Sequence, residues 1–506
     1  MKSLIKICFY LFVILLISGC NDFDGLKLNL DFESIKSDQS EPVGWDIFEE
    51  GYNVALDKKV RYSGKYSLRI ESDPDNSCYK GSGSISYLYH GIQDNQRIKV
   101  TGFIKNESTN KDSIALFIGC YTAGGSLENI THNKEFFGTH DWQEYSVELV
   151  ASKETKYLAF GAIMSGPGKI WVDNIRLFID DNEVFTQSYI YSYRATRNEI
   201  NWLKSSIIPI KTVKAENGFE DLEPLKQALK DARIIALGEN THGSREVFEM
   251  KHRMIEFLTA EMGFNAFAIE SFLPEHSLIN HYIQTGFGEP LKVMNTLIPA
   301  WNTQEVLQMV QWMKGYNQNA QTKLRFFGFD IDPKYASLNT TRYYRDSCMA
   351  VNVERILKDN PTCKIILWAH NEHISKDPLA MGHYLYNRFG NEYYSIGFSS
   401  NKGKYTAGTS KRYSISTDNK LVKSITGSID YNFSRAGRSV FFLDLKYIPE
   451  SDSDSQWLTK KMYFRTIGGG ATDNQFHPEL IVGKFDGIIF INRTTATEPL
   501  YNKNGL

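Results

Sequence analysis

Short apolar runs recur from Arg233 to Ile491 of the 506-residue chain, and helical patterns separate them. Short apolar runs bounded by turn residues are typical of strands that are buried on both faces. Strands that alternate with helices predict an α/β fold with a mainly parallel sheet and flanking helices. The predicted strands are Arg233–Leu237, Ala266–Ile269, Arg325–Phe329, Ile365–Trp368, Tyr394–Phe398, Val440–Leu443 and Gly487–Ile491.

Two of the segments between these runs carry a clear helical repeat. Val247–Glu261 and Thr303–Tyr316 each place apolar residues on one face, which would pack against the sheet. Thr303 has the side chain of an N-cap residue. In folds of this class the ligand site lies at the C-terminal ends of the strands. The residues that follow each predicted strand are therefore the first candidates for a functional site.

Acidic residues and histidines follow four of the predicted strands directly. The chain contains only 11 histidines, so three of them at two strand ends favour a function. Because the carboxyl ends of parallel strands meet at one edge of the sheet, we expect these side chains to lie together. Glu239 and His242 follow the first strand, Glu270 the second, Asp330 and Asp332 the third, and His370 and His373 the fourth.

Several of these residues also have a structural explanation. Glu239 could favour the start of a helix through the helix dipole, and His242 could be an ordinary turn histidine. Glu270 directly follows a buried run, where an unpaired carboxylate is costly, so it needs a partner, and His242 is the natural candidate. Asp330 and Asp332 are better explained as residues that cap a helix or hold a loop.

Motifs in this half of the chain resemble the erythromycin esterase family. The resemblance covers residues 210 to 506 and keeps the order of the motifs. It implies an esterase whose active site contains Glu239, His242, Glu270, His370 and His373. One departure is Asn240, where many relatives carry a small residue. The motifs are GENTHGSREVFEMKHRMIEFL from Gly238, GFNAFAIES from Gly263, WNTQE from Trp301, FGFDID from Phe327, WAHNEHI from Trp368 and FDGIIFINRTTATEP from Phe485.

The chemistry of ester or lactone hydrolysis fits these residue types. It requires a water molecule, a base that deprotonates it, and donors at the carbonyl oxygen. We predict that His242 is the base, oriented by Glu270 or Glu239, because the pKa of imidazole lies near neutral pH. His370 and His373 would position the carbonyl or donate to the leaving oxygen. Alternatively, the same five side chains could bind an active-site divalent metal such as zinc or manganese, although no HExxH motif is present.

Other classes of protein fit less well. A serine hydrolase would require a GxSxG motif, which the sequence lacks. The segment 238–244 resembles a phosphate-binding loop, but it has no lysine after its second glycine, and Glu239 would repel phosphate. The net charge of −2 does not indicate a nucleic-acid partner. A catalytically inactive glycan-binding surface protein is the non-enzymatic alternative.

The first part of the chain has a different sequence pattern. Short alternating strands separated by Gly, Asn, Asp and Ser predict an all-β sandwich or jelly roll over residues 26–180, followed by a linker at 181–210 and the α/β domain at 211–506. Local motifs such as SGKYSLRI from Ser63 and WVDNI from Trp171 resemble carbohydrate-binding modules. That resemblance implies a glycan partner and a structural calcium at Glu33 and Asp173. For Trp45, Trp142 and Trp171, core packing is a better explanation than sugar stacking.

The N-terminus resembles a bacterial lipoprotein signal. Lys2 and Lys6 precede the apolar run Ile7–Ile17, and Gly19-Cys20 follows. We therefore expect residues 1–20 to be a signal that ends in a lipidated Cys20, which would anchor the protein to a membrane of the cell envelope, outside the cytoplasm. In such an oxidising compartment Cys78 and Cys120 could form a disulfide.

Overall fold

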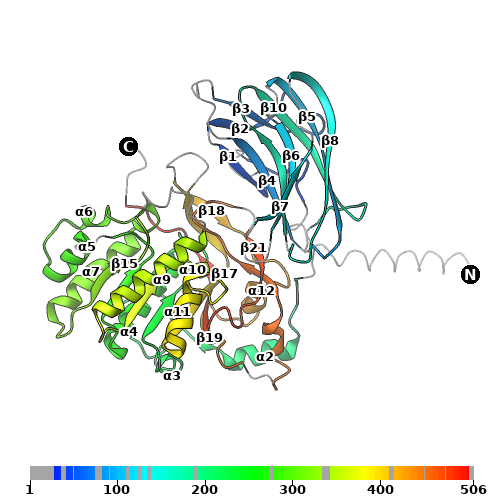
Figure 1. The fold of residues 1–506 in the computed structure, drawn as a ribbon. Helices are drawn as coiled ribbons and strands as arrows, with labels where there is room; N and C mark the ends of the chain where they lie inside the picture. Colours follow the sequence, from blue (N-terminus) through cyan, green and yellow to red (C-terminus); the bar gives the residue numbers. More distant parts are fainter. Residues whose placement is uncertain are drawn as a thin grey trace, which may run out of the picture. The chain divides into compact units, whose positions relative to one another are not determined.

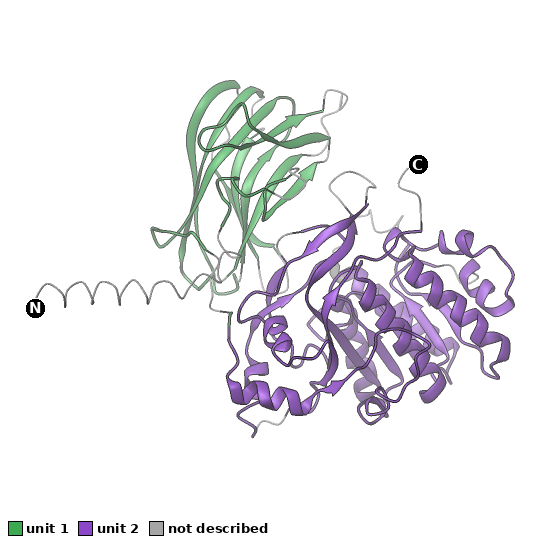
Figure 2. Ribbon diagram, turned by 180° about the vertical axis from the view of Figure 1, so that it is seen from behind, with its two compact units in different colours: residues 1–192 green, residues 193–506 purple. Residues whose placement is uncertain are grey.

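The chain divides into two compact units, residues 1–192 and 193–506 (Figure 2). Each is described separately below. No helix in the described part of the chain is long and apolar enough to cross a membrane. The signal, Cys20 and Cys78 lie outside the described residues. The computed structural model describes residues 28–500 except 36–40, 50, 74–81, 91, 110–113, 122–126, 134–137, 156, 187–190, 274–276, 333–341, 409–414, 449–450 and 473–474.

The first unit is a sandwich of two antiparallel sheets (Figure 1). One sheet has the order β1-β4-β9-β6-β7, and the other has the order β2-β3-β10-β5-β8 with β11 paired to β10. Alternate residues of β4 point into a single apolar core, which confirms the predicted β-sandwich. The strands are Trp45–Glu49 (β1), Tyr52–Asp57 (β2), Ser67–Ser72 (β3), Gly83–His90 (β4), Arg97–Thr109 (β5), Ile114–Tyr121 (β6), Leu127–His132 (β7), Gly138–Val150 (β8), Tyr157–Met164 (β9), Lys169–Ile179 (β10) and Asn182–Glu183 (β11).

The two carboxylates expected to bind calcium hold a turn of the backbone. Asp173 accepts hydrogen bonds from the amides of Tyr62 and Ser63, at 2.8 and 2.9 Å. Glu33 accepts one from the amide of Lys65 at 2.6 Å. Asp173 is buried, and its amide contacts supply the partners that a buried carboxylate requires. Both acids thus fix the turn before β3, and calcium binding at them stays a prediction.

The tryptophans of the first unit follow the core-packing prediction in two of three cases. Trp45 and Trp171 are buried, and their indole N–H groups donate to the carbonyl of Asn29 and the carboxylate of Asp57. Trp142 is partly exposed. Glycan binding by this unit stays a prediction. Cys120 is a buried free thiol.

The second unit contains the predicted mainly parallel sheet. Its order is β12-β19-β22-β17-β13-β16-β14-β15, with β18 paired to β17. From β22 to β15 every neighbouring pair is parallel. The strands are Ile208–Pro209 (β12), Ile234–Leu237 (β13), Ala266–Ile269 (β14), Arg325–Gly328 (β15), Ile365–Trp368 (β16), Tyr393–Gly408 (β17), Ile415–Leu421 (β18), Val440–Asp444 (β19) and Gly487–Thr494 (β22), with Met462–Arg465 (β20) and Phe476–Glu479 (β21) forming a separate pair.

Helices cover both faces of this sheet (Figure 1). Helices α3 to α7 pack with Ile235 and Leu237 of β13, whereas α2 and α9 to α12 pack with Ile234 and Ala236. Burial on both faces explains why the strands are apolar without alternation. The helices are Arg197–Ser206 (α2), Leu225–Leu229 (α3), Arg245–Met262 (α4), Leu278–Thr285 (α5), Pro290–Met294 (α6), Gln304–Asn319 (α7), Arg342–Asp359 (α9), Asn371–Ile374 (α10), Met381–Phe389 (α11) and Ile429–Ser434 (α12).

Local sequence signals account for several helix ends. Thr303 caps α7 as predicted, because its side chain accepts a hydrogen bond from the amide of Val306. Gly263 ends α4 with a left-handed φ of 71°. Thr196 forms a capping box with Glu199 at the start of α2. This helix and β12, which pairs with β19, lie within the predicted linker, so residues 193–210 are part of the second unit.

Candidate active site

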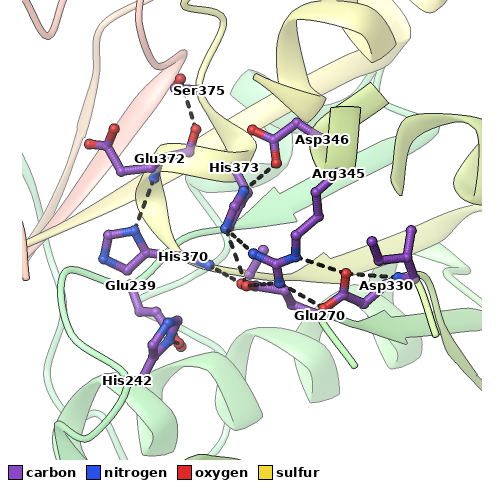
Figure 3. Close-up of polar contacts among 12 residues, drawn as sticks. Glu239, His242, Glu270, Asp330, Arg345, Asp346, His370, Glu372, His373 and Ser375 are labelled. Atoms are coloured by element: carbon purple, nitrogen blue, oxygen red, sulfur yellow. Dashed lines mark hydrogen bonds and ion pairs between the residues drawn. The ribbon is translucent and has the colours of Figure 1, made fainter. Parts of the chain in front are cut away.

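Three neighbouring strands bring the predicted site residues to one edge of the large sheet. β16 lies between β13 and β14, and the three strands are parallel. The turns that follow them therefore meet at their carboxyl ends, as the sequence predicted. Figure 3 shows the resulting group of side chains. Glu239 and His242 follow β13, Glu270 follows β14, and His370 and His373 follow β16.

Glu239 is fully buried between two nitrogen atoms. Its Oε1 lies 2.6 Å from Nδ1 of His242, and its Oε2 lies 2.6 Å from Nζ of Lys251, which is itself fully buried. Lys251 also donates to the carbonyl of Ala369 at 3.3 Å and lies 4.3 Å from the centre of the Trp368 ring. The carboxylate is thus held on one side by a cation and on the other side by the imidazole.

These partners decide the charge of Glu239. Burial alone would raise its pKa, but the Lys251 ammonium and the His242 ring together hold the pKa below the ordinary value. Burial lowers the pKa of Lys251 to about 8, although Glu239 opposes that shift. At neutral pH the pair is therefore a buried carboxylate and ammonium.

The turn around Glu239 has little room for larger residues. A Cβ atom at residue 238 would collide with the side-chain amide oxygen of Asn371. A Cβ atom at residue 243 would collide with the backbone of Thr406. Asn371 is buried and joins its side chain to the backbone of Phe398 in β17. The glycines of the GENTHG motif thus allow the turn to pack closely, and Asn371 has a structural role in that packing.

Glu270 belongs to a second ionic group. Its Oε1 lies 2.9 Å from a guanidinium nitrogen of Arg345 and 3.2 Å from Nε2 of His373, and its Oε2 accepts a hydrogen bond from the amide of His370 at 2.9 Å. Arg345 also makes a bidentate contact with Asp330, at 3.0 and 2.7 Å. Burial would raise the pKa of Glu270, but His373, His242 and Arg345 hold it well below its usual range.

His373 is a buried imidazolium. Its Nδ1 lies 2.5 Å from Oδ1 of Asp346, while its Nε2 faces Glu270. Burial would lower its pKa, but the two carboxylates outweigh burial and raise the pKa to about 10. Both ring nitrogens therefore donate to carboxylates at neutral pH, and neither can accept a proton.

His370 is neutral, and both of its ring nitrogens bind the backbone. Its Nε2 lies 2.8 Å from the carbonyl oxygen of Ile467, and its Nδ1 accepts the amide hydrogen of Glu372 at 3.3 Å, at the start of α10. Burial, together with the charge of His242, lowers its pKa to about 4. The tautomer with hydrogen on Nε2 satisfies both contacts.

His242 is the most exposed of the five residues, with 16% of its side chain accessible. Its ring packs edge-to-face against Trp301 and His370, with centroid distances of 5.5 and 5.1 Å. Within the described residues its Nε2 has no hydrogen-bond partner. His242 thus combines a fixed ring with one free nitrogen.

The ligand arrangement that a metal requires is not found. Among the residues that the structure describes, no group of three or more His, Cys, Asp or Glu side chains could hold a metal ion. The ring nitrogens of His370 and His373 are committed to protein groups, as are the oxygens of Glu239 and Glu270. The five side chains are arranged as two hydrogen-bonded ionic groups around a neutral histidine.

The five residues lie at one edge of the sheet, as the sequence predicted, but their pairing differs from the prediction. We expected Glu270 to pair with His242, whereas Glu239 is the partner of His242 and Glu270 binds Arg345 and His373. Lys251, which the sequence did not mark as a site residue, is fully buried against Glu239. Asp330 holds Arg345, which agrees with its expected structural role.

Two site residues were missed altogether. Arg345 and Asp346 lie near the start of α9, which follows the segment 333–341 outside the described residues. The sequence predicts no strand directly before them, so the search at strand ends could not identify them. An available signal was the charge requirement, because the buried Glu270 after β14 needed a nearby cation.

The model of a known protein family matches much of the unit that contains this site. The model of the family described as erythromycin esterase matches residues 259–344 and 334–494. The second unit belongs to the erythromycin esterase family. The matched residues of this esterase-family unit include Glu270, His370 and His373, whereas Glu239 and His242 precede them.

Curated relatives of this esterase-family unit match over part of their length. An Escherichia coli erythromycin esterase type II is 32% identical over 130 residues, which are 26% of this chain and 31% of the relative. YbfO of Bacillus subtilis, a protein named as a hydrolase, is 33% identical over 156 residues, which are 30% of this chain and 34% of the relative. The chain thus spans about a third of the length of these relatives.

Solved structures match the unit over their full length. A succinoglycan biosynthesis protein is 25% identical with a TM-score of 0.50, and the match covers 62% of this chain and 100% of that chain. A Bacillus cereus protein is 21% identical with a TM-score of 0.51, covering 60% of this chain and 98% of that chain. The second of these supports the fold alone.

Proposed function

We propose that the second unit hydrolyses a carboxylic ester or lactone with a water molecule that His242 activates. The 2.6 Å contact between Nδ1 of His242 and Oε1 of Glu239 carries this proposal. A carboxylate at Nδ1 favours the tautomer that leaves the lone pair on Nε2, the nitrogen without a hydrogen-bond partner among the described residues. Because Lys251 keeps Glu239 ionised, the carboxylate also stabilises the imidazolium that forms when the base takes a proton.

The reaction follows from these roles. Nε2 of His242 removes a proton from water, and the hydroxide attacks the carbonyl carbon to give a tetrahedral intermediate. The carbon–oxygen bond to the alcohol then breaks, and the imidazolium returns the proton to the leaving oxygen. The products are a carboxylic acid and an alcohol, and His242 is neutral again.

Arg345 is the proposed partner for the carbonyl oxygen. Its side chain is 31% exposed, and two of its nitrogens are fixed by Asp330 and Glu270. The third nitrogen lies 3.3 Å from Nε2 of His373, which is itself a donor in the imidazolium form. The hydrogens of that nitrogen are therefore available to an oxygen that becomes negative in the transition state.

His370 and His373 take supporting roles in this mechanism. The sequence suggested that they contact the carbonyl or the leaving oxygen, but their ring nitrogens are bound to Ile467, Glu372, Asp346 and Glu270. His370 packs against the ring of His242, and His373 adds positive charge beside Glu270. Both are thus positioning residues.

We further propose that the protein acts at the cell envelope. The Gly19-Cys20 ending of the N-terminal apolar run supports lipidation of Cys20, which would tether both units outside the cytoplasm. We expect the wild-type chain to partition into the detergent phase of a cell extract. We expect Cys20→Ala to lose this partition. Equal partition of the two chains would contradict the anchor.

The substrate class is tested with the soluble form from Asn21. We expect hydrolysis in a panel of macrolide lactones, acylated glycans and aryl esters, and no hydrolysis by His242→Ala, which should bind the same compounds. The names of the relatives make a macrolide lactone and an acylated sugar the first compounds to try. If wild type and His242→Ala behave identically across the panel, the proposed function is wrong.

A further inference from the structure

A groove of about 910 Å³ lies on the second unit, apart from the proposed active site. Helices α4 and α7 and the segment 214–217 form its walls. None of Glu239, His242, Glu270, His370 and His373 lines it. Its volume lies within the range of pockets that bind small molecules.

The groove and the active site use different faces of α4. Arg245, Glu249 and His252 line the groove, and their spacing of four and three residues places them on one face of the helix. Lys251 points from another face into the active site, where it meets Glu239. A ligand in the groove would therefore be separated from the catalytic residues by the helix.

Two aromatic rings on α7 give the groove an aromatic wall. Trp312 and Tyr316 both line it, are partly exposed, and stack with a centroid distance of 5.5 Å and an interplanar angle of 29°. His252 packs edge-to-face on Trp312 at 5.7 Å and fixes the orientation of the indole. Burial lowers the pKa of His252 to about 4, so this ring is neutral.

Gly315 leaves space beside these rings. It lies between Trp312 and Tyr316 on α7 and lines the groove, and a Cβ at this position would meet no atom within 4 Å. Glycine in a helix is less favourable than alanine by about 1 kcal/mol. A larger side chain at residue 315 would therefore fill part of the groove without disturbing the fold.

The remaining lining is polar and nearly balanced in charge. Gln308 and Gln311 on α7 and Asn217 opposite them carry exposed amides, which can donate and accept at once. The cation of Arg245 is paired with the buried Glu305 at 3.1 Å. Burial raises the pKa of Glu249, and the charge of Lys214 opposes that shift.

We propose that this groove binds a neutral pyranose sugar, as part of an oligosaccharide. Aromatic rings offer a surface to the C–H face of a pyranose, and the amides and carboxyl group match its hydroxyls. A cationic peptide is the alternative ligand for aromatic rings beside acids. A cation in the lining, Lys214, disfavours a cationic ligand, and the three amides along the groove favour the sugar. This inference does not depend on ester hydrolysis.

The test compares glycan binding by full-length variants. Wild type, Gly315→Leu and Gly315→Ala would be applied to a printed array of unesterified neutral oligosaccharides, and the best probe would then be titrated by calorimetry. We expect wild type and Gly315→Ala to bind a common set of probes, and Gly315→Leu to bind them at least about tenfold more weakly. Trp312→Ala should lose the same probes, whereas Trp142→Ala in the first unit should keep them.

Two controls make the outcome decisive. Gly315→Leu should unfold at or above the wild-type temperature, because leucine is a better helix former than glycine, and this result would show that the fold was kept. If no probe is bound better by wild type than by Gly315→Leu, the groove is not a sugar site. Binding of a lysine-rich peptide that Gly315→Leu abolishes, in place of glycan binding, would likewise overturn the proposal.

Discussion

Nζ of Lys251 lies 2.6 Å from Oε2 of Glu239, and neither side chain is exposed. The other oxygen of the same carboxylate lies 2.6 Å from Nδ1 of His242. The lysine therefore controls the charge of the group that orients the proposed base.

Lys251→Met should damage both stability and the pH profile. Removing one partner of a buried ion pair costs roughly 3–5 kcal/mol, because the remaining charge is left uncompensated. The pKa of Glu239 is held below its ordinary value partly by Lys251, so it should rise in the variant. The acid limb of kcat/KM should then move to higher pH, which a pH–rate profile measures.

Lys226→Met is the matched control for that variant. Lys226 is partly exposed and lies 2.8 Å from both Glu223 and Glu261, so Lys226→Met also removes a lysine that is paired with carboxylates. Surface pairs of this kind contribute little to stability, and the pH profile should be that of wild type. Equal effects in the two variants would show that burial of the Lys251–Glu239 pair has no special role.

Arg345→Met should lower kcat more than it changes KM. The guanidinium is proposed to meet charge that develops in the transition state, and loss of one such donor reduces kcat by about 10²–10³. Arg355→Met, at an exposed position on the same helix, should retain wild-type kinetics. A pure KM effect in Arg345→Met would assign the arginine to ground-state binding.

The two histidines after β16 should have opposite protonation states. At a pH about one unit above the ordinary pKa of histidine, ¹⁵N spectra of the imidazole rings should show two protonated nitrogens for His373 and one for His370. This follows from pKa values of about 10 and about 4, respectively. A neutral His373 would contradict its placement between the carboxylates of Glu270 and Asp346.

The raised pKa of His373 also predicts a pH dependence of stability. A histidine whose pKa rises on folding stabilises the native state fully below its unfolded pKa, and that contribution is lost as pH rises through about 10. Asp346→Asn removes one of the carboxylates that raise the pKa. The difference in Tm between wild type and Asp346→Asn should therefore be largest just below the unfolded pKa of histidine, about 6.5, and should shrink as the pH rises toward 10.

Removal of divalent metals should leave hydrolysis unchanged. Among the described residues no group of side chains is arranged to hold a metal, and the proposed base acts through an imidazole. Dialysis against a chelator, followed by assay in metal-free buffer, should retain full activity. Loss of activity that zinc or manganese restores would establish the metal-dependent alternative.

The sequence predicted the strands and the site edge well, for a physical reason. β14 and β16 have the predicted bounds, because short apolar runs between turns leave few alternatives. A polar residue that directly follows such a run must lie at the strand end. The identities of Glu239, Glu270 and His370 as edge residues therefore followed from local sequence.

The pairing of these residues could not be predicted in the same way. It depends on strand order, and β16 lies between β13 and β14 although it comes later in the chain. This order separates Glu270 from His242 and leaves Glu239 as the partner of His242. Arg345 comes from a helix that no local pattern connects to the site, so only the three-dimensional arrangement identifies it.

The first unit shows the same limit at its predicted calcium site. Glu33 and Asp173 were correctly associated with each other, since both bind the turn at 62–66. The acids of a turn and the acids of a calcium site look alike in sequence. The contacts with backbone amides show the structural role of both acids, and those contacts depend on how the turn packs, whereas calcium binding stays a prediction.

Chemical rescue of His242→Ala tests the central claim most directly. With an ester that wild type hydrolyses, the variant should lose about 10²–10⁴ in kcat, and added imidazole should restore part of the rate in proportion to its neutral form. The partial exposure of His242 gives imidazole access to the vacated position. Hydrolysis by His242→Ala at the wild-type rate, without imidazole, would contradict the assignment of His242 as the base.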